Sequence, residues 1–334
     1  MLRSVAAVAA LAVLGAATPL PAQRLDLAGE LRQIARAAGG TLGVRVLHVE
    51  SGSGASLNAD QWFPMMSVYK LPIVIHALRM SDAGTLDLAR RVTLTAEDRR
   101  PGLSPLAVRI AERGPQTLTL REAISSVIRI SDNTASDALL RIAGGPGAVQ
   151  ATLRQLGFSG IDVSRYELEF SADYHGVCCL ERMKPFSLER FFEAADRVTA
   201  ADRRKAAAAF LADRRDAAQP AAMASLMAGV VRGQLLSSAS TSWLLDEMAE
   251  MHTRDTGLRA GLPAGTRAGL RPGTSGETGG IRAAHNDNAI VTLPGGRGHL
   301  VIAAFLKGSR GTDARRDATL AAVARAAYGW AIRR

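Results

Sequence analysis

Apolar and polar residues alternate in short runs near the start of the chain. Thr41–Val49 follows the two-residue period of a half-buried β-strand. Glu50–Gly54 contains two glycines and three polar residues between the runs, which predicts a turn. A second strand is expected over Ala55–Trp62. The N-terminal region therefore predicts two neighbouring strands.

The C-terminal third returns to a strand-like period after a long helical region. Gly295 and Gly296 separate two of its runs, and this spacing predicts an antiparallel hairpin. Ala314–Arg333 has the length of a closing helix. The three strands expected here are Arg267–Ser275, Ile281–Leu293 and His299–Gly308.

The middle of the chain has apolar residues at helical spacing. Thr119-Leu120-Arg121-Glu122 has the form of a capping box, which marks the start of a helix toward Ile130. Gly144-Gly145-Pro146 is a helix stop. The other helices expected are Met66–Met80, Asn133–Ile142, Pro220–Val231 and Ser240–Met251.

Strands at both ends with helices between them predict an α/β (α+β) fold. One antiparallel sheet is built from both termini and flanked by helices, and an all-helical lobe is inserted into it. We expect an α/β lobe formed by residues 23–62 and 238–334, and a helical lobe formed by residues 63–237. The cleft between two such lobes is where a ligand site is expected.

The first residues resemble a secretory signal peptide. Met1-Leu2-Arg3 precedes an apolar run from Val5 to Ala17, and small Ala22 stands before Gln23. The run is too short to span a bilayer. We expect residues 1–22 to be removed and the mature protein to be periplasmic, without stable membrane association.

Composition excludes several classes of protein. The net charge is +10, but the basic residues are spread along the chain and aromatic residues make up only 4%, so a nucleic-acid partner is not expected. Cys178 and Cys179 are adjacent, and neighbouring Cα atoms about 3.8 Å apart are too close for an ordinary disulfide. The six histidines form no metal-binding spacing, so no metal is predicted.

Lysine is rare in this chain, and its first occurrence has a special context. Lys70 is one of only four lysines among 41 basic residues, and it follows Ser67 by three positions. A lysine amine can be desolvated until it accepts a proton, whereas arginine stays protonated. Residues three apart share a helix face. The pair is therefore a candidate nucleophile with its base, although Ser-x-x-Lys also arises by chance.

Three further segments carry polar groups suited to a cleft. Ser131-Asp132-Asn133 lies between two helices, where Asp132 is best explained as a helix cap and Ser131 and Asn133 can face a site. Arg271-Pro272-Gly273-Thr274-Ser275-Gly276 lies on an expected strand whose glycines allow close approach of a substrate to the backbone. The Thr274 N–H is a candidate oxyanion donor. Glu167 is a candidate base for activating water, and Glu169 is expected to be solvated.

In this order, the segments resemble the class A serine β-lactamases and, more widely, the penicillin-recognising serine enzymes. Ser67-Val68-Tyr69-Lys70 and Ser131-Asp132-Asn133 match two of the family's three signatures. Leu262-Pro263-Ala264-Gly265 and Arg215–Ala224 are similar to the family as well. The resemblance covers nearly the whole mature chain, and the motifs are specific as an ordered set.

The resemblance implies a role for each of these residues, with a β-lactam as the small-molecule substrate, no cofactor and a monomeric protein. Ser67 would be acylated, with Lys70 as its base, and Ser131 would pass a proton to the leaving nitrogen. The N–H groups of Ser67 and Thr274 would form the oxyanion hole, and Glu167 would activate the deacylating water. The residues implied to bind substrate are Asn133, Arg271, Thr274, Ser275 and, at the cleft mouth, Leu103.

Two positions depart from the family pattern. The third signature, Lys-Thr-Gly, has become Arg271-Pro272-Gly273, which keeps the charge but loses a hydroxyl and a backbone N–H. We expect a neighbouring group to compensate, and the candidates are Thr274, Ser275, Arg254 and Arg282. Ser171 stands where the family often has an asparagine that holds the deacylating water.

The Ω-loop expected from the resemblance is enlarged. If Arg165 and Asp216 close it, the loop spans residues 165–216 and contains a helical insertion at about residues 177–211. A surface decoration is favoured over a lid, because surface loops tolerate insertions well.

The function expected is a serine β-lactamase. Two alternatives remain on the same residues: a D-alanyl-D-alanine carboxypeptidase-like enzyme, or a weakly active or non-catalytic penicillin-binding relic. Glu167 argues against the peptidase, whereas Pro272 and Ser171 keep the relic open.

Overall fold

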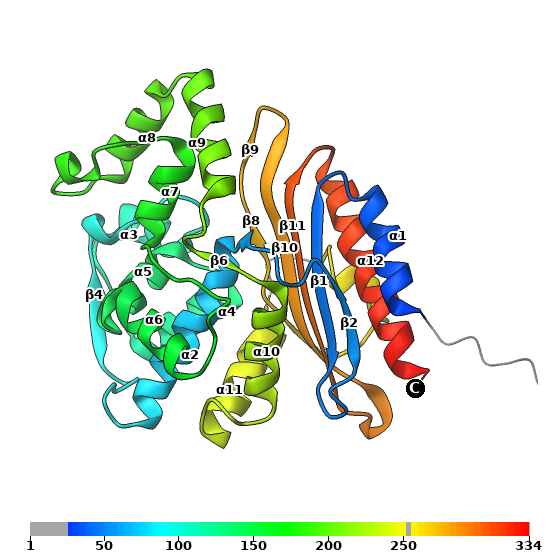
Figure 1. Ribbon diagram of the computed structural model, residues 1–334. Helices are drawn as coiled ribbons and strands as arrows, with labels where there is room; N and C mark the ends of the chain where they lie inside the picture. The colour runs from blue at the N-terminus through cyan, green and yellow to red at the C-terminus, as the bar shows by residue number, and fades with distance from the viewer. Residues whose placement is uncertain (1–25, 252–254, 334) are drawn as a thin grey trace, which may run out of the picture.

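The computed structural model describes residues 26–251 and 255–333, so the expected signal peptide lies outside the described residues. A twisted sheet has two helices on one side and a lobe of helices on the other (Figure 1). Both ends of the described chain contribute to the sheet side. The expected α/β fold with an inserted helical lobe is thus confirmed. Within the described ranges, no helix combines the length and the apolar composition needed to span a membrane.

The main sheet is antiparallel throughout, in the order β2-β1-β11-β10-β7, and two short strands also pair with β10. N-terminal β1 lies beside C-terminal β11, with Thr41 opposite Lys307 and Val44 opposite Ala304. The ends of the chain therefore depend on each other for backbone pairing. The strands are β1 (Thr41–His48), β2 (Gly54–Leu57), β7 (Ala268–Leu270), β8 (Gly273–Thr274), β9 (Glu277–Thr278), β10 (Ile281–Thr292) and β11 (His299–Ser309).

Strand β11 is buried on both faces, which explains its nearly unbroken run of apolar residues. Leu300 and Ile302 pack toward α1 (Leu27–Ala37) and α12 (Asp313–Ile332), whereas Val301 and Phe305 join the core of the helical lobe. Helix α10 (Pro220–Val231) packs on β1 and β11 from that side. The sheet is thus the wall between two hydrophobic cores.

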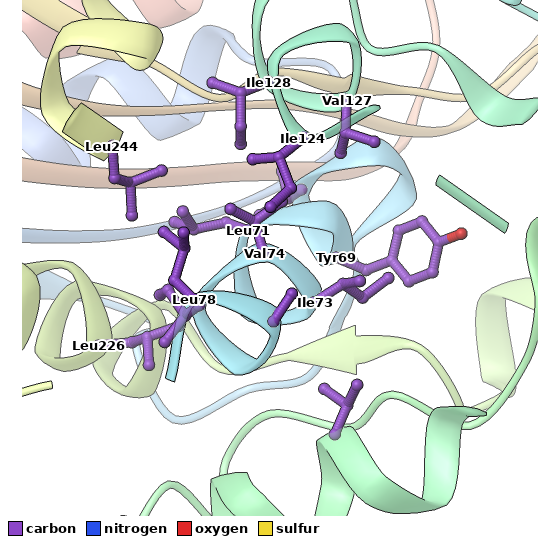
Figure 2. Close-up of a cluster of buried hydrophobic side chains, with 14 of the residues drawn as sticks. Tyr69, Leu71, Ile73, Val74, Leu78, Ile124, Val127, Ile128, Leu226 and Leu244 are labelled. Carbon is purple, nitrogen blue, oxygen red and sulfur yellow. The ribbon is translucent and has the colours of Figure 1, made fainter. Parts of the chain in front are cut away.

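The helical lobe surrounds α2 (Lys70–Asp82), which is buried from Lys70 through Leu78. A helix that is apolar on all sides is stable only inside a core. Figure 2 shows Leu71, Val74 and Leu78 of this helix within a cluster of apolar side chains. The helices that pack on α2 are α4 (Leu120–Arg129), α5 (Asn133–Ile142) and α6 (Gly145–Gln155), and further out lie α3 (Pro105–Arg113), α7 (Glu167–His175) and α11 (Ser238–Ala249).

Two of the expected strands are shorter than the sequence pattern indicated. The second strand ends at Leu57, because Asn58 has a φ of 48° and its side chain bonds the carbonyl of Leu42. The strand expected from Arg267 divides into β7 and β8, with Arg271 and Pro272 between them. Helix α1 was not expected, although Asp26 caps it by accepting a bond from its first turn.

The enlarged Ω-loop closes through the expected ion pair. Arg165 Nε lies 2.6 Å from Asp216 Oδ2, and the Asp216 carboxylate also accepts two backbone N–H bonds. Burial raises the pKa of Asp216, and the Arg165 guanidinium opposes this rise. Between the two residues lie α8 (Leu188–Arg197) and α9 (Ala200–Ala212), which extend beyond α7 at one end of the helical lobe (Figure 1).

This buried pair generates a stability prediction. Arg165→Met leaves the fully buried Asp216 carboxylate without its cation, and breaking a buried pair in this way costs about 3–5 kcal/mol. We expect the free energy of unfolding, measured by urea denaturation, to fall by that amount. The control is Arg197→Met, which removes the exposed Arg197–Glu193 pair and should cost less than about 1 kcal/mol. Equal losses in the two variants would contradict the prediction.

Candidate active site

The candidate nucleophile lies where the two lobes meet. Ser67 is half-buried in a short 3-10 turn, η1 (Met66–Tyr69), which runs directly into α2. Met66 has a φ of 50°, an uncommon conformation for a non-glycine residue that is typical of functional sites. Strand β8 passes against this turn: a Cβ on Gly273 would lie 2.3 Å from the carbonyl oxygen of Met65. Glycine at 273 therefore lets the sheet lobe approach the serine.

Lys70 lies one turn further along and has no exposed surface. Its Nζ is 3.4 Å from Ser67 Oγ, 3.2 Å from Ser131 Oγ, 2.6 Å from the Ser131 carbonyl and 2.5 Å from Asn133 Oδ1. A protonated amine has only three N–H bonds for these four oxygens, and a neutral amine has a lone pair that can accept a hydroxyl proton. The geometry therefore suits proton exchange with either serine.

The electrostatics favour the same exchange. Burial and the neighbouring Arg271 charge together lower the pKa of Lys70 to about 8, although the Glu167 carboxylate opposes the change. An amine with this pKa has a substantial neutral fraction near neutral pH, unlike an ordinary lysine. Lys70 can therefore act as a base on Ser67.

Ser131 lies between two cations. Its φ is 59°, and its Oγ accepts from Lys70 and, at 2.7 Å, from Arg271 Nη2. Arg271 is itself fully buried and donates to the carbonyls of Val127 and Ile128. Burial lowers the pKa of Arg271 to about 10, which leaves it charged near neutral pH. Two adjacent positive groups favour release of the Ser131 proton.

Asn133 contacts both Lys70 and Glu167, the candidate base for activating water. Its Oδ1 accepts from Lys70, and its Nδ2 donates to Glu167 Oε1 at 3.0 Å and to the carbonyl of Pro101 at 2.7 Å. Asp132 is the N-cap of α5, as expected. The amide of Asn133 is thus fully engaged within the protein.

Glu167 begins α7 and is buried, whereas Glu169 is exposed and bonds the Tyr166 N–H. Burial raises the pKa of Glu167, and the Lys70 charge opposes the rise. Asp137 accepts the Glu167 N–H at 2.6 Å and so fixes the start of the helix. Ser171 follows Glu167 by one helical turn, and both residues line the main cavity. A water held between them would have its base in reach.

Strand β8 carries the candidate oxyanion donor, the Thr274 N–H. The N–H groups of Arg271 and Ser275 bond β10 carbonyls at 2.8 and 2.9 Å. Alternation along an antiparallel strand then directs the Thr274 N–H to the opposite edge, toward η1. An N–H at position 272 would point to that same edge, away from β10, so proline here removes no ladder bond. Proline therefore costs no bond of the β-ladder, although this position still lacks both the hydroxyl and the N–H.

The candidates for replacing that hydroxyl differ in their partners and in their exposure. Ser275 is buried, and its Oγ bonds the carbonyl of Gly276 and the N–H of Ala284. Arg282 is bound to the Ser275 carbonyl and to Asp313. Arg254 lies outside the described residues. Thr274 remains, because it is exposed and lines the cavity.

A cavity of about 730 Å³, which is large enough for a drug-sized ligand, is lined by Ser67, Ser131, Asn133, Glu167, Ser171 and Thr274, whereas Lys70, Arg271 and Ser275 lie behind its wall. Leu103 and Phe192 line it and are both about half exposed. Phe192 belongs to α8, so the insertion contributes to the cavity wall. Arg99 ties this helix to the loop before Leu103 through a 2.6 Å ion pair with Glu189. The insertion is therefore more than a surface decoration.

Known proteins are similar to this chain over most of its length. A model of the β-lactamase enzyme family matches residues 26–331. The β-lactamase VEB-1 of Pseudomonas aeruginosa is 26% identical, over 92% of this chain and 91% of its own length.

Solved structures are similar over the same extent. A β-lactamase from Chitinophaga pinensis superposes with a TM-score of 0.75 at 29% identity, covering 91% of this chain and 98% of that one. An ancestral class A β-lactamase superposes with a TM-score of 0.71 at 30% identity, covering 90% and 98%. With the family model extending over nearly the whole described chain, the protein belongs to the class A β-lactamase family.

Proposed function

We propose that this protein is a serine β-lactamase that hydrolyses β-lactam antibiotics through an acyl-enzyme on Ser67. The observation that carries the proposal is the continuous contact from Ser67 through Lys70 and Asn133 to Glu167. This chain of contacts joins a nucleophile and its base to a second carboxylate base. Acylation and deacylation thus each have their own proton acceptor.

In the first step, Lys70 takes the proton of Ser67, and Oγ attacks the lactam carbonyl carbon. The N–H groups of Ser67 and Thr274 stabilise the resulting oxyanion. The carbon–nitrogen bond then breaks, and Ser131 passes its proton to the departing nitrogen and regains one from the protonated Lys70. The positive charge of Arg271 beside Ser131 favours this transfer and attracts the substrate carboxylate.

In the second step, Glu167 removes a proton from a water molecule held near Ser171, and the water attacks the ester carbon. The bond to Ser67 Oγ breaks, and the proton that Glu167 took from the water is returned to Ser67, which restores both groups. A D-alanyl-D-alanine peptidase has no need of a dedicated base for this step, so the buried Glu167 favours the lactamase. The proposal includes export to the periplasm through the leader at residues 1–22, and action as a monomer.

The test is to incubate the purified protein with nitrocefin while recording turnover and intact mass. Continuous turnover supports the lactamase. A single persistent adduct without turnover would instead favour the trapped relic. The absence of both turnover and adduct would overturn the proposed function.

Ser67→Ala tests the nucleophile. We expect turnover to fall by roughly 10⁴-fold or more and no covalent penicillin adduct to form, because the attacking oxygen is gone. Thermal unfolding should show an intact fold, since the hydroxyl donates no bond that shapes η1. An adduct that still forms in this variant would remove Ser67 from its proposed role.

Glu167→Gln tests the deacylation base. The amide keeps the size of the side chain but cannot take a proton from water, so the acyl-enzyme should accumulate and persist for many minutes in intact-mass spectra. Glu169→Gln is the matched control on the exposed neighbour and should turn over like the parent. Parent-like turnover of Glu167→Gln would place the base elsewhere.

Thr274→Val tests compensation for the missing hydroxyl. It removes the hydroxyl but keeps the backbone N–H, and a lost hydrogen bond to the substrate carboxylate should lower kcat/KM by about tenfold or more. Pro272→Thr alone should change little, whereas Pro272→Thr combined with Thr274→Val should recover most of the loss. Unchanged kcat/KM in Thr274→Val would show that another group binds the carboxylate.

A further inference from the structure

Tyr69 lies inside the nucleophile motif, between Ser67 and Lys70, yet the proposed reaction steps do not use it. Its ring is fully buried and is stacked on Phe170 of α7, with centroids 6.0 Å apart and an interplanar angle of 4°. Figure 2 shows the ring at the margin of the apolar cluster, with its hydroxyl directed away from the neighbouring aliphatic side chains. The hydroxyl of this core residue is therefore directed toward groups outside the apolar cluster.

Three buried polar atoms lack hydrogen-bond partners in this region. They are Tyr69 Oη, Ser136 Oγ on α5 and Glu167 Oε2 on α7, and none has a fully formed hydrogen bond within the described residues. The other carboxylate oxygen of Glu167 is bound by Asn133. A buried polar atom without a partner is costly, so three together require an explanation.

The same three groups influence one another directly. The Tyr69 hydroxyl acts as a hydrogen-bond donor that lowers the pKa of Glu167, although burial raises that pKa more strongly. Ser136 in turn lowers the pKa of Tyr69, while burial and the Glu167 charge raise it well above its ordinary value. The groups are thus close enough to interact without having reached full hydrogen-bond geometry, and Tyr69 stands between the other two.

We propose that Tyr69 is a positioning residue that donates a hydrogen bond to Glu167 Oε2 and accepts one from Ser136 during turnover. With Asn133 on Oε1 and Tyr69 on Oε2, both carboxylate oxygens have a fixed donor. The orientation of Glu167 toward the cavity is then set by η1 and α5 as well as by its own helix. This inference rests on the proposed function, because it concerns the deacylation base.

The pH dependence follows from the groups that surround Glu167. Lys70 favours its ionised form, whereas Asp137 and Asp216 oppose it, and the neutral Tyr69 hydroxyl favours it by donation. Loss of the hydroxyl therefore raises the pKa of Glu167. The carboxylate is the active form, so the acid limb of the deacylation rate moves to higher pH.

The experiment is the pH profile of deacylation in Tyr69→Phe, which removes only the hydroxyl and keeps the ring on Phe170. At acidic pH we expect kcat to fall by about tenfold, with recovery toward the parent at higher pH. The acylation rate, from the single-turnover burst, should stay within about twofold of the parent, which also reports an intact fold. A merely structural role would lower both rates without moving the limb.

Two further variants keep the proposal falsifiable. Ser136→Ala removes the donor to Tyr69 and should move the acid limb in the same direction by a smaller amount. Tyr174→Phe removes another buried tyrosine hydroxyl, which lies beside Gly276, and should leave the limb where the parent has it. If the acid limb of the deacylation rate lies at the parent's pH in both Tyr69→Phe and Ser136→Ala, the inference is wrong. A parent without turnover would instead overturn the proposed function.

Discussion

The site depends on one constraint, which is the burial of an amine at the start of the central helix. Lys70 has no exposed surface, and the oxygens around it come from η1 and from the segment that opens α5. Ionic groups are not removed from water without partners, so these segments must hold their positions for the amine to be accommodated. The same burial lowers the pKa of the amine, so the packing requirement and the chemical one are met by a single arrangement.

The larger elements could be predicted from sequence because their residues carry local signals. Helices α5 and α10 begin and end where the capping and stop signals place them. The two long strands β10 and β11 follow from the two-residue period and the glycine pair between them. The second strand was predicted to be longer than it is. Asn58 ends it by adopting a left-handed conformation, which hydrophobic periodicity does not reveal.

The site was predictable in its motifs but not in its connections. Ser67, Lys70, Ser131, Asn133 and Glu167 were found as separate segments, and the structure brings them together around one cavity. Asp137, Tyr69 and Phe192 were missed, because their roles arise from contacts between elements distant in the chain. Ser275 was expected to face substrate, but strand alternation turns its hydroxyl to the backbone behind the site. Such orientations depend on register, which a motif does not encode.

The closing pair of the Ω-loop also has a meaning for how this protein can diversify. Because Arg165 and Asp216 bring the two ends of a long excursion together, the helices between them begin and end at one place on the scaffold. Added length in such an excursion costs little entropy once its ends are fixed. Variation in α8 and α9 can therefore reshape one wall of the cavity while the catalytic residues stay in place. The insertion is in this sense an exchangeable module, comparable to a grafted binding loop on a rigid framework.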